Sequence, residues 1–119
     1  MRPKRRDLDP ADANLTGFLS NATGAGPFTM ATTTSGDTLA HQVSIRNDTA
    51  NDHSGKTFTL TGTDADGRTQ TEVVTGPGAS ATVESAKYFL TVTSSTVSAT
   101  IGADTVDFGW VDEVASQTY

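Results

Sequence analysis

The chain has 119 residues, a length that suits one domain. It contains no cysteine, which excludes a disulfide framework and a cysteine-based metal site. No apolar run approaches the roughly 20 residues needed to span a bilayer, so no membrane partner is expected.

The net charge of −6 is unevenly distributed along the chain. Four of the eight basic residues lie at the start, namely Arg2, Lys4, Arg5 and Arg6. From Asp7 onward, four basic residues against fourteen acidic ones give a charge of −10. An acidic body disfavours nucleic-acid binding, because contacts with phosphates need Lys and Arg. The basic tip could bind an acidic partner or nucleic acid, or it could be a solvated, disordered start.

Residues 1–25 lack a regular hydrophobic period, and we expect an extended N-terminal arm in front of a β domain of residues 26–119. A short helical turn over residues 9–15 is conceivable, with Asp9 as the N-cap and Pro10 at the first helical position. The apolar residues of the arm are expected to dock either on this domain or on a neighbour; they are Leu15, Phe18 and Leu19.

From Pro27 onward, apolar and polar residues alternate in short segments separated by turn signals. The pattern predicts strands over residues 28–34, 39–46, 57–63, 68–75, 96–101 and 104–111, with one or two more over 80–85 and 87–93. The predicted inward residues include Phe28, Met30, Phe58, Leu60, Tyr88, Leu90, Val92, Val97, Ala99, Ile101, Val106, Phe108 and Trp110. Seven or eight short strands favour an all-β fold, either an antiparallel sandwich (Ig-like or jelly-roll-like) or a small barrel.

Threonine alternates with other residues through two of these segments, 57–63 and 69–75. Threonine is β-branched and carries a hydroxyl, so it suits the wet face of a sheet. Between the segments, Asp66-Gly67 predicts a tight hairpin turn. Asp64 and Asp66 are also spaced like the start of a calcium loop. Position twelve of such a loop would be Thr75 instead of glutamate, so turn chemistry is the favoured explanation.

The two histidines are the first candidates for chemistry. His41 lies in the apolar register of its strand, which favours a partly buried ring over a metal ligand. His53 lies in a polar loop with Asp48 and Asp52, where a metal site is conceivable but a solvated loop is favoured. No nucleophile elbow, phosphate-binding loop or catalytic triad is recognisable. We therefore expect no enzymatic activity, no metal and no cofactor.

Residues 58–111 resemble small virion proteins of tailed bacteriophages. Such proteins combine a TGTDxxGRxxTE hairpin, a TGP turn, a KYFxTVTSxTVS strand pair and a GADTVxxGW ending, and each occurs here in that order. The segment SGDTLAHQVSI, residues 35–45, also matches the usual lead-in. The resemblance covers about two thirds of the chain and does not reach residues 1–25.

This resemblance implies a structural role in a phage particle, and a capsid decoration (cement) protein on the capsid surface is the first expectation. Its partners would be the major capsid protein and neighbouring copies of itself, with oligomers in the assembled particle. The docking residues would be the basic tip and the apolar residues of the arm. A head–tail connector or tail component is the alternative in the same class. A glycan- or host-surface-binding module is another, with Trp110 and Tyr119 as stacking platforms.

Overall fold

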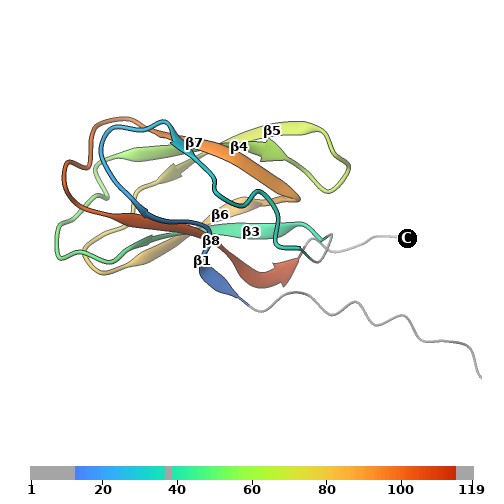
Figure 1. Cartoon of the computed structure of the whole chain (residues 1–119), viewed down its shortest axis with the longest axis horizontal. Helices are drawn as coiled ribbons and strands as arrows, with labels where there is room; N and C mark the ends of the chain where they lie inside the picture. Colours follow the sequence, from blue (N-terminus) through green and yellow to red (C-terminus); the bar gives the residue numbers. More distant parts are fainter. Residues whose placement is uncertain (1–12, 37–38, 115–119) are drawn as a thin grey trace, which may run out of the picture.

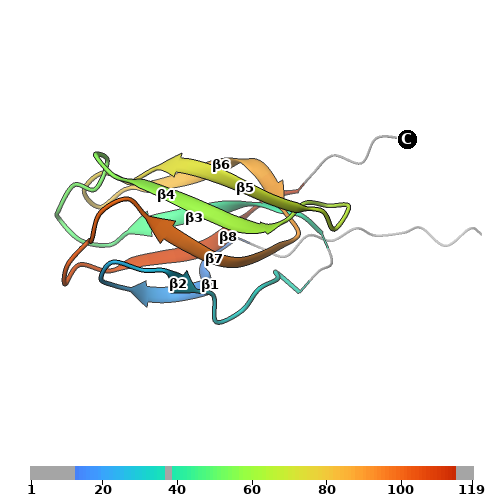
Figure 2. The ribbon, with the colours of Figure 1, turned by 90° about the horizontal axis from the view of Figure 1, so that it is seen from above.

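The computed structural model describes residues 13–36 and 39–114, and every structural statement below concerns those residues. They form eight strands and two antiparallel four-stranded sheets that pack face to face (Figures 1 and 2). The strands are β1 (Asn14–Ala22), β2 (Phe28–Thr29), β3 (His41–Asn47), β4 (Thr57–Thr63), β5 (Thr69–Thr75), β6 (Thr82–Phe89), β7 (Thr91–Val97) and β8 (Val106–Val114). The predicted β-sandwich is confirmed.

The first sheet has the strand order β1-β8-β3-β6, and the second has the order β2-β7-β4-β5. Their facing sides form one hydrophobic core that includes four fully buried phenylalanines, Phe18, Phe58, Phe89 and Phe108. The rings of Phe28, Phe58 and Phe108 contact one another, and the centroid of Phe58 lies 6.4 Å from that of Phe28 and 6.0 Å from that of Phe108. The alternation in β8 is confirmed as well, because Val106, Phe108 and Trp110 all point into this core.

The predicted boundary between arm and domain at residues 25 and 26 is wrong. β1 is an edge strand of the first sheet and pairs with β8, with Leu19 opposite Phe108 and Ala22 opposite Val106. The ladder is irregular, and its register shifts twice. Because of these shifts, apolar and polar residues do not alternate regularly along β1, which explains why its sequence did not predict a strand. Asn14 and Leu15, placed in a possible helical turn, are also strand; the rest of that turn, residues 9–12, lies outside the described residues.

The predicted strand over residues 28–34 is shortened to two residues because the hydrogen bonds of this segment alternate between the two sheets. The Met30 N–H donates to the carbonyl of Thr93 in the second sheet, whereas Ala31 and Thr32 both donate to Phe18 in the first. The Thr33 carbonyl again accepts from Val92 on β7. A segment that moves from one sheet to the other cannot stay in a single ladder.

Two further expectations about strands need correction. The chain switches sheets at Leu90, between β6 and β7, so the alternation does not continue across it. As a result Phe89 is buried in the core, and Tyr88 is only half-buried. Residues 98–101 are not strand either, although Ile101 is buried. The Thr100 hydroxyl accepts a hydrogen bond from the Gly102 N–H, a local bond that favours a turn over a ladder.

The threonine segments form the hairpin β4–β5, as predicted. Phe58 and Leu60 are fully buried, and the β4 and β5 threonines are exposed or half-buried. The Asp64 side chain accepts hydrogen bonds from the N–H groups of Asp66 and Arg68, and Gly67 adopts a φ of 84°. Since turn geometry accounts for Asp64 and Gly67, their spacing requires no calcium ion.

One side of the sandwich, where the edge strands β5 and β6 meet, is closed by side chains. The Glu72 carboxylate on β5 accepts hydrogen bonds from the backbone N–H groups of Ala86 and Lys87 on β6, at 2.7 and 2.8 Å. Gln70 Nε2 donates to the Tyr88 carbonyl at 2.7 Å. These bonds occupy backbone groups that another strand could otherwise pair with.

Gly62 in β4 is a position where the packing of two strands tolerates no side chain. A Cβ built at Gly62 would overlap the backbone carbonyl of Thr91 on β7. We expect Gly62→Ala to lower the free energy of unfolding by about 1–3 kcal/mol, because the ladder must shift to admit the methyl group. Urea unfolding followed by circular dichroism measures this change. Gly55→Ala is the control, since a Cβ there meets open space, and an equal loss in both variants would contradict the explanation.

Candidate functional site

Both ends of the described chain lie at the same end of the sandwich (Figure 1). Asn14, at the start of β1, lies opposite Trp110, and Val114, at the end of β8, lies opposite His41. The turn between β4 and β5 is at this end too (Figure 1). The terminal segments, with the predicted basic tip, therefore start from this end of the domain, which makes it the candidate site for a partner.

The structure places the predicted docking residues in different environments. Arg2, Lys4, Arg5 and Arg6 lie outside the described residues. Leu15 is half-buried on β1. Phe18 is 2% exposed, and its ring packs edge-on against Trp110 at a centroid distance of 5.1 Å. Leu19 packs against the same core.

The sequence left open whether these apolar residues pack on this domain or on a neighbour. Phe18 and Leu19 pack on their own domain. Phe18 is removed from the surface that a partner could contact, because its side chain fills the space between the sheets. This corrects its expected role as an anchor.

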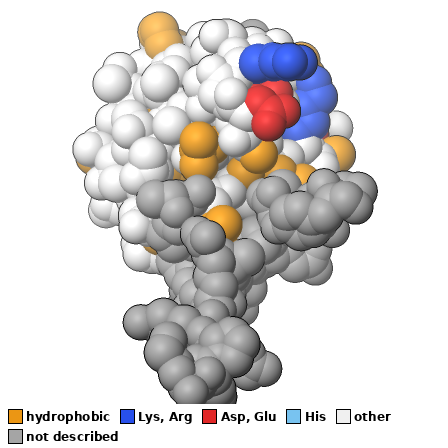
Figure 3. Space-filling view, turned by 90° about the vertical axis from the view of Figure 1, so that its right-hand side faces the viewer, with side chains coloured by type: hydrophobic (Ala, Val, Ile, Leu, Met, Phe, Trp, Pro, Cys, Tyr) orange, Lys and Arg blue, Asp and Glu red, His pale blue; other side chains and the backbone are white. Residues whose placement is uncertain are grey.

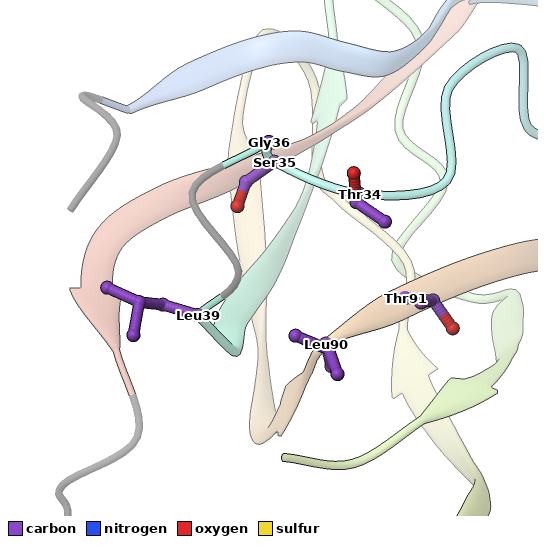
Figure 4. A pocket seen from close by; sticks show the side chains of 6 residues that line it. All are labelled: Thr34, Ser35, Gly36, Leu39, Leu90 and Thr91. Carbon is purple, nitrogen blue, oxygen red and sulfur yellow. The ribbon is translucent and has the colours of Figure 1, made fainter. Parts of the chain in front are cut away.

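An apolar hollow of about 290 Å³ lies at this end of the sandwich (Figure 4). It is lined by the segment of residues 34–36, by Leu39 ahead of β3, and by Leu90 and Thr91 at the junction of β6 and β7. Viewed from this end, hydrophobic side chains are visible below a corner with charged side chains (Figure 3).

The hollow is at the lower limit of the volumes that hold small molecules, about 300–1,000 Å³. Among the described residues, those that line the hollow include no acid, base or strong nucleophile, and they offer mainly apolar contact. The sequence had placed Leu90 on an inward face, and the break in alternation at Leu90 is the signal that could have identified the hollow.

The opposite end of the sandwich is held by a polar network around His53, which was expected in a solvated loop. His53 is instead 4% exposed. Its Nδ1 lies 3.0 Å from Lys56 Nζ, and its Nε2 lies 3.0 Å from Asp104 Oδ2. Because an ammonium group can only donate, Nδ1 accepts and the Nε2–H donates to Asp104. Asn51 donates to both oxygens of the same carboxylate, so the network joins the loops before β4 and β8.

His41 is 1% exposed, as its register predicted, and its Nδ1 is bonded to the carbonyl of Val111 at 2.6 Å. Trp110 is 7% exposed and packs against both Phe18 and His41. Trp110 therefore offers no open face for stacking on a sugar. Tyr119, the other proposed stacking platform, lies outside the described residues.

Asp52, in the loop before β4, has a pKa below its ordinary value of 3.8, chiefly because its carboxylate accepts the backbone N–H of Ser54. A lowered pKa in the folded state means that ionised Asp52 contributes stability above pH 3.8, and this contribution is lost as the pH falls below it. We expect Asp52→Asn to reduce the fall of the melting temperature between pH 4 and pH 2. Thermal unfolding at several pH values measures this fall, and an unchanged slope would contradict the assignment.

No group of three or more His, Cys, Asp or Glu side chains is gathered for a metal ion within residues 13–36 and 39–114. The same residues contain no helix that is long and apolar enough to cross a membrane. The chain matches no family model, no curated protein and no solved structure at a significant level.

Proposed function

We propose that this chain is a non-enzymatic structural component of a bacteriophage virion, a capsid decoration protein that docks on the shell and stabilises it. The observation that carries the proposal is the position of Asn14 and Val114, at the two ends of the described chain, at the same end of the sandwich as an apolar hollow. The resemblance of residues 58–111 to phage virion proteins adds to it, since that segment supplies β4 to β8 of the sandwich. Major capsid protein subunits and neighbouring copies of this chain are the proposed partners.

The docking would use two kinds of contact. Arg2, Lys4, Arg5 and Arg6 would meet acidic groups of the shell, and the hollow between Leu39 and Leu90 would receive an apolar side chain. The twelve residues before Ala13 would reach at most about 40 Å if they were fully extended, which sets the largest distance between the two contacts. Two linked contacts bind more tightly than either alone, and rupture of the shell must then break both.

Co-sedimentation with decoration-free shells of the parent phage tests this function. The full chain is compared with a chain that lacks residues 1–12 and with a variant in which Arg2, Lys4, Arg5 and Arg6 are serine. We expect the full chain to saturate at the capsid-protein copy number or a simple fraction of it, and both variants to bind more weakly. The matched control is Arg46→Ser with Arg68→Ser, which removes two exposed charges from the body and is expected to bind normally.

The outcome also separates this role from its alternatives. Saturation at a dozen copies or fewer would contradict a decoration protein and favour a connector or tail component. Absence of binding to the shell would overturn the proposal. A variant with Leu90→Asp, checked for folding by circular dichroism, tests the hollow: normal binding would exclude it from the contact.

A further inference from the structure

β5 is an edge strand whose outer backbone groups can be identified from the ladder it forms with β4. The Asp64 N–H donates to the Arg68 carbonyl, and the Gly76 N–H donates to the Lys56 carbonyl, at the two ends of the register that pairs Phe58 with Val74. Because hydrogen-bonded pairs alternate in an antiparallel ladder, the even-numbered residues of β5 bond to β4. The odd-numbered residues therefore direct their N–H and C=O groups to the free edge; they are Thr69, Thr71, Val73 and Thr75.

The other edges of the molecule are less available than β5. The β6 edge is occupied by the side chains of Glu72 and Gln70. On the β1 edge, the Phe18 carbonyl accepts hydrogen bonds from the N–H groups of Ala31 and Thr32, and β2 is two residues long. On the free edge of β5, the Thr71 carbonyl accepts a hydrogen bond from Lys87 Nζ, an exposed side chain that can move away. β5 has no proline and a regular register with β4, so it lacks two common features that prevent pairing.

The side chains of β5 that point away from the core are uncharged. Thr69, Thr71 and Thr75 are exposed, and Val73 is 62% exposed, the one large exposed hydrophobic side chain among the described residues. A chain with a net charge of −6 repels its own copies, and an uncharged edge is where two copies approach at the lowest electrostatic cost. An exposed β-branched side chain on an open edge is also a typical site of strand pairing.

We propose that β5 pairs antiparallel with β5 of a second copy, with Val73 on the two-fold axis. In this register Val73 lies opposite Val73 of the second copy, and Thr71 lies opposite Thr75, so all facing groups on the outer side are uncharged. The neighbouring register, centred on Glu72, places two carboxylates directly opposite each other, which destabilises a strand pair. The second sheets of the two copies then form one continuous sheet. Lys87 Nζ leaves the Thr71 carbonyl and remains in water.

This pairing does not depend on the proposed function, because it concerns the free protein, and shell binding can fail while the pairing holds. Sedimentation equilibrium of the full chain over a concentration series measures the dimer. We expect Val73→Lys to raise the dimer dissociation constant at least tenfold, since it places two charges opposite each other. Thr96→Lys is the matched control: this residue is exposed on β7, two strands from the edge, and its dimer is expected to be unchanged.

Disulfide trapping tests the register, and it is clean because the natural chain has no cysteine. Val73→Cys is expected to cross-link with itself under mild oxidation. An equal mixture of Thr71→Cys and Thr75→Cys chains is expected to yield more of the mixed dimer than random pairing gives, which is twice the amount of either homodimer. The statistical ratio, or a preference for homodimers, would overturn the register.

The remaining outcomes also decide the proposal. A chain that stays monomeric at all concentrations, or a Val73→Lys dimer as stable as that of Thr96→Lys, would overturn it. If the dimer disappears when residues 1–12 are removed, the β5 edge would instead bind residues 1–12 of the second copy, and this result would also overturn β5–β5 pairing. A dimer that persists without residues 1–12 supports it.

Discussion

Removal of residues 1–25 is expected to unfold the domain, whereas removal of residues 1–12 is expected to leave it folded. The longer deletion removes β1 and with it Phe18, whose ring is buried against Trp110. Loss of a buried phenylalanine costs about 3–5 kcal/mol, and the loss of the β1–β8 ladder adds to this cost. A domain of this size has a total stability of about 5–15 kcal/mol, so little or none remains.

The fluorescence of the single tryptophan, Trp110, measures this result directly. In the full chain Trp110 is buried, and its emission is expected at short wavelength; without residues 1–25 it is expected to shift to longer wavelength. Urea unfolding of the chain without residues 1–12 should match that of the full chain. A cooperative transition with buried tryptophan in the chain without residues 1–25 would mean that β1 is dispensable.

Phe58→Ala is expected to lower the free energy of unfolding by about 3–5 kcal/mol. Phe58 has no exposed surface and lies on the inner strand β4, where its ring contacts the rings of Phe28 and Phe108. Its removal leaves a cavity between the two sheets, which a small rigid core fills only in part.

Urea unfolding measured by circular dichroism gives the size of this effect. Thr57→Ala, on the neighbouring exposed position, is the control and is expected to stay within about 0.5 kcal/mol of the natural chain. Similar losses of unfolding free energy in Phe58→Ala and Thr57→Ala would show that β4 does not stabilise the domain through its buried side chains.

The parts of the fold that the sequence predicts are those with a regular period and a local turn. β4 and β8 alternate cleanly, so their existence and their inward residues follow from residue order alone, and Gly67 supplies the positive φ of the predicted hairpin between β4 and β5. The number of such strands predicts an all-β fold, but it left the choice between a sandwich and a small barrel open.

The errors arise where tertiary contacts decide the structure. β1 is irregular because its pairing with β8 shifts twice, and the strand expected at Phe28 stops early because Ala31 and Thr32 turn to Phe18. These contacts join residues that are far apart in sequence, so no local pattern encodes them.

The candidate site was predictable only in part, for the same reason. His53 has a loop sequence that reads as solvated, yet Asp104, about fifty residues later, bonds to its ring and encloses it. The apolar hollow arises because Leu39 and Leu90 precede and follow strands that meet at one end. The basic tip remains a prediction from charge, since it lies outside the described residues.

Both ends of the described chain lie at one end of the sandwich. This position would allow the two ends to be joined and the chain to be opened elsewhere, so that the strands follow one another in a rotated order. Residues 115–119 followed directly by residues 1–13 would provide an 18-residue connection from β8 back to β1, strands that are already neighbours. New termini could then be opened at the exposed pair Ala79 and Ser80, at the opposite end between β5 and β6. The domain is thus suited to circular permutation, and a permuted chain would keep every strand pair while its free ends face away from the proposed docking end.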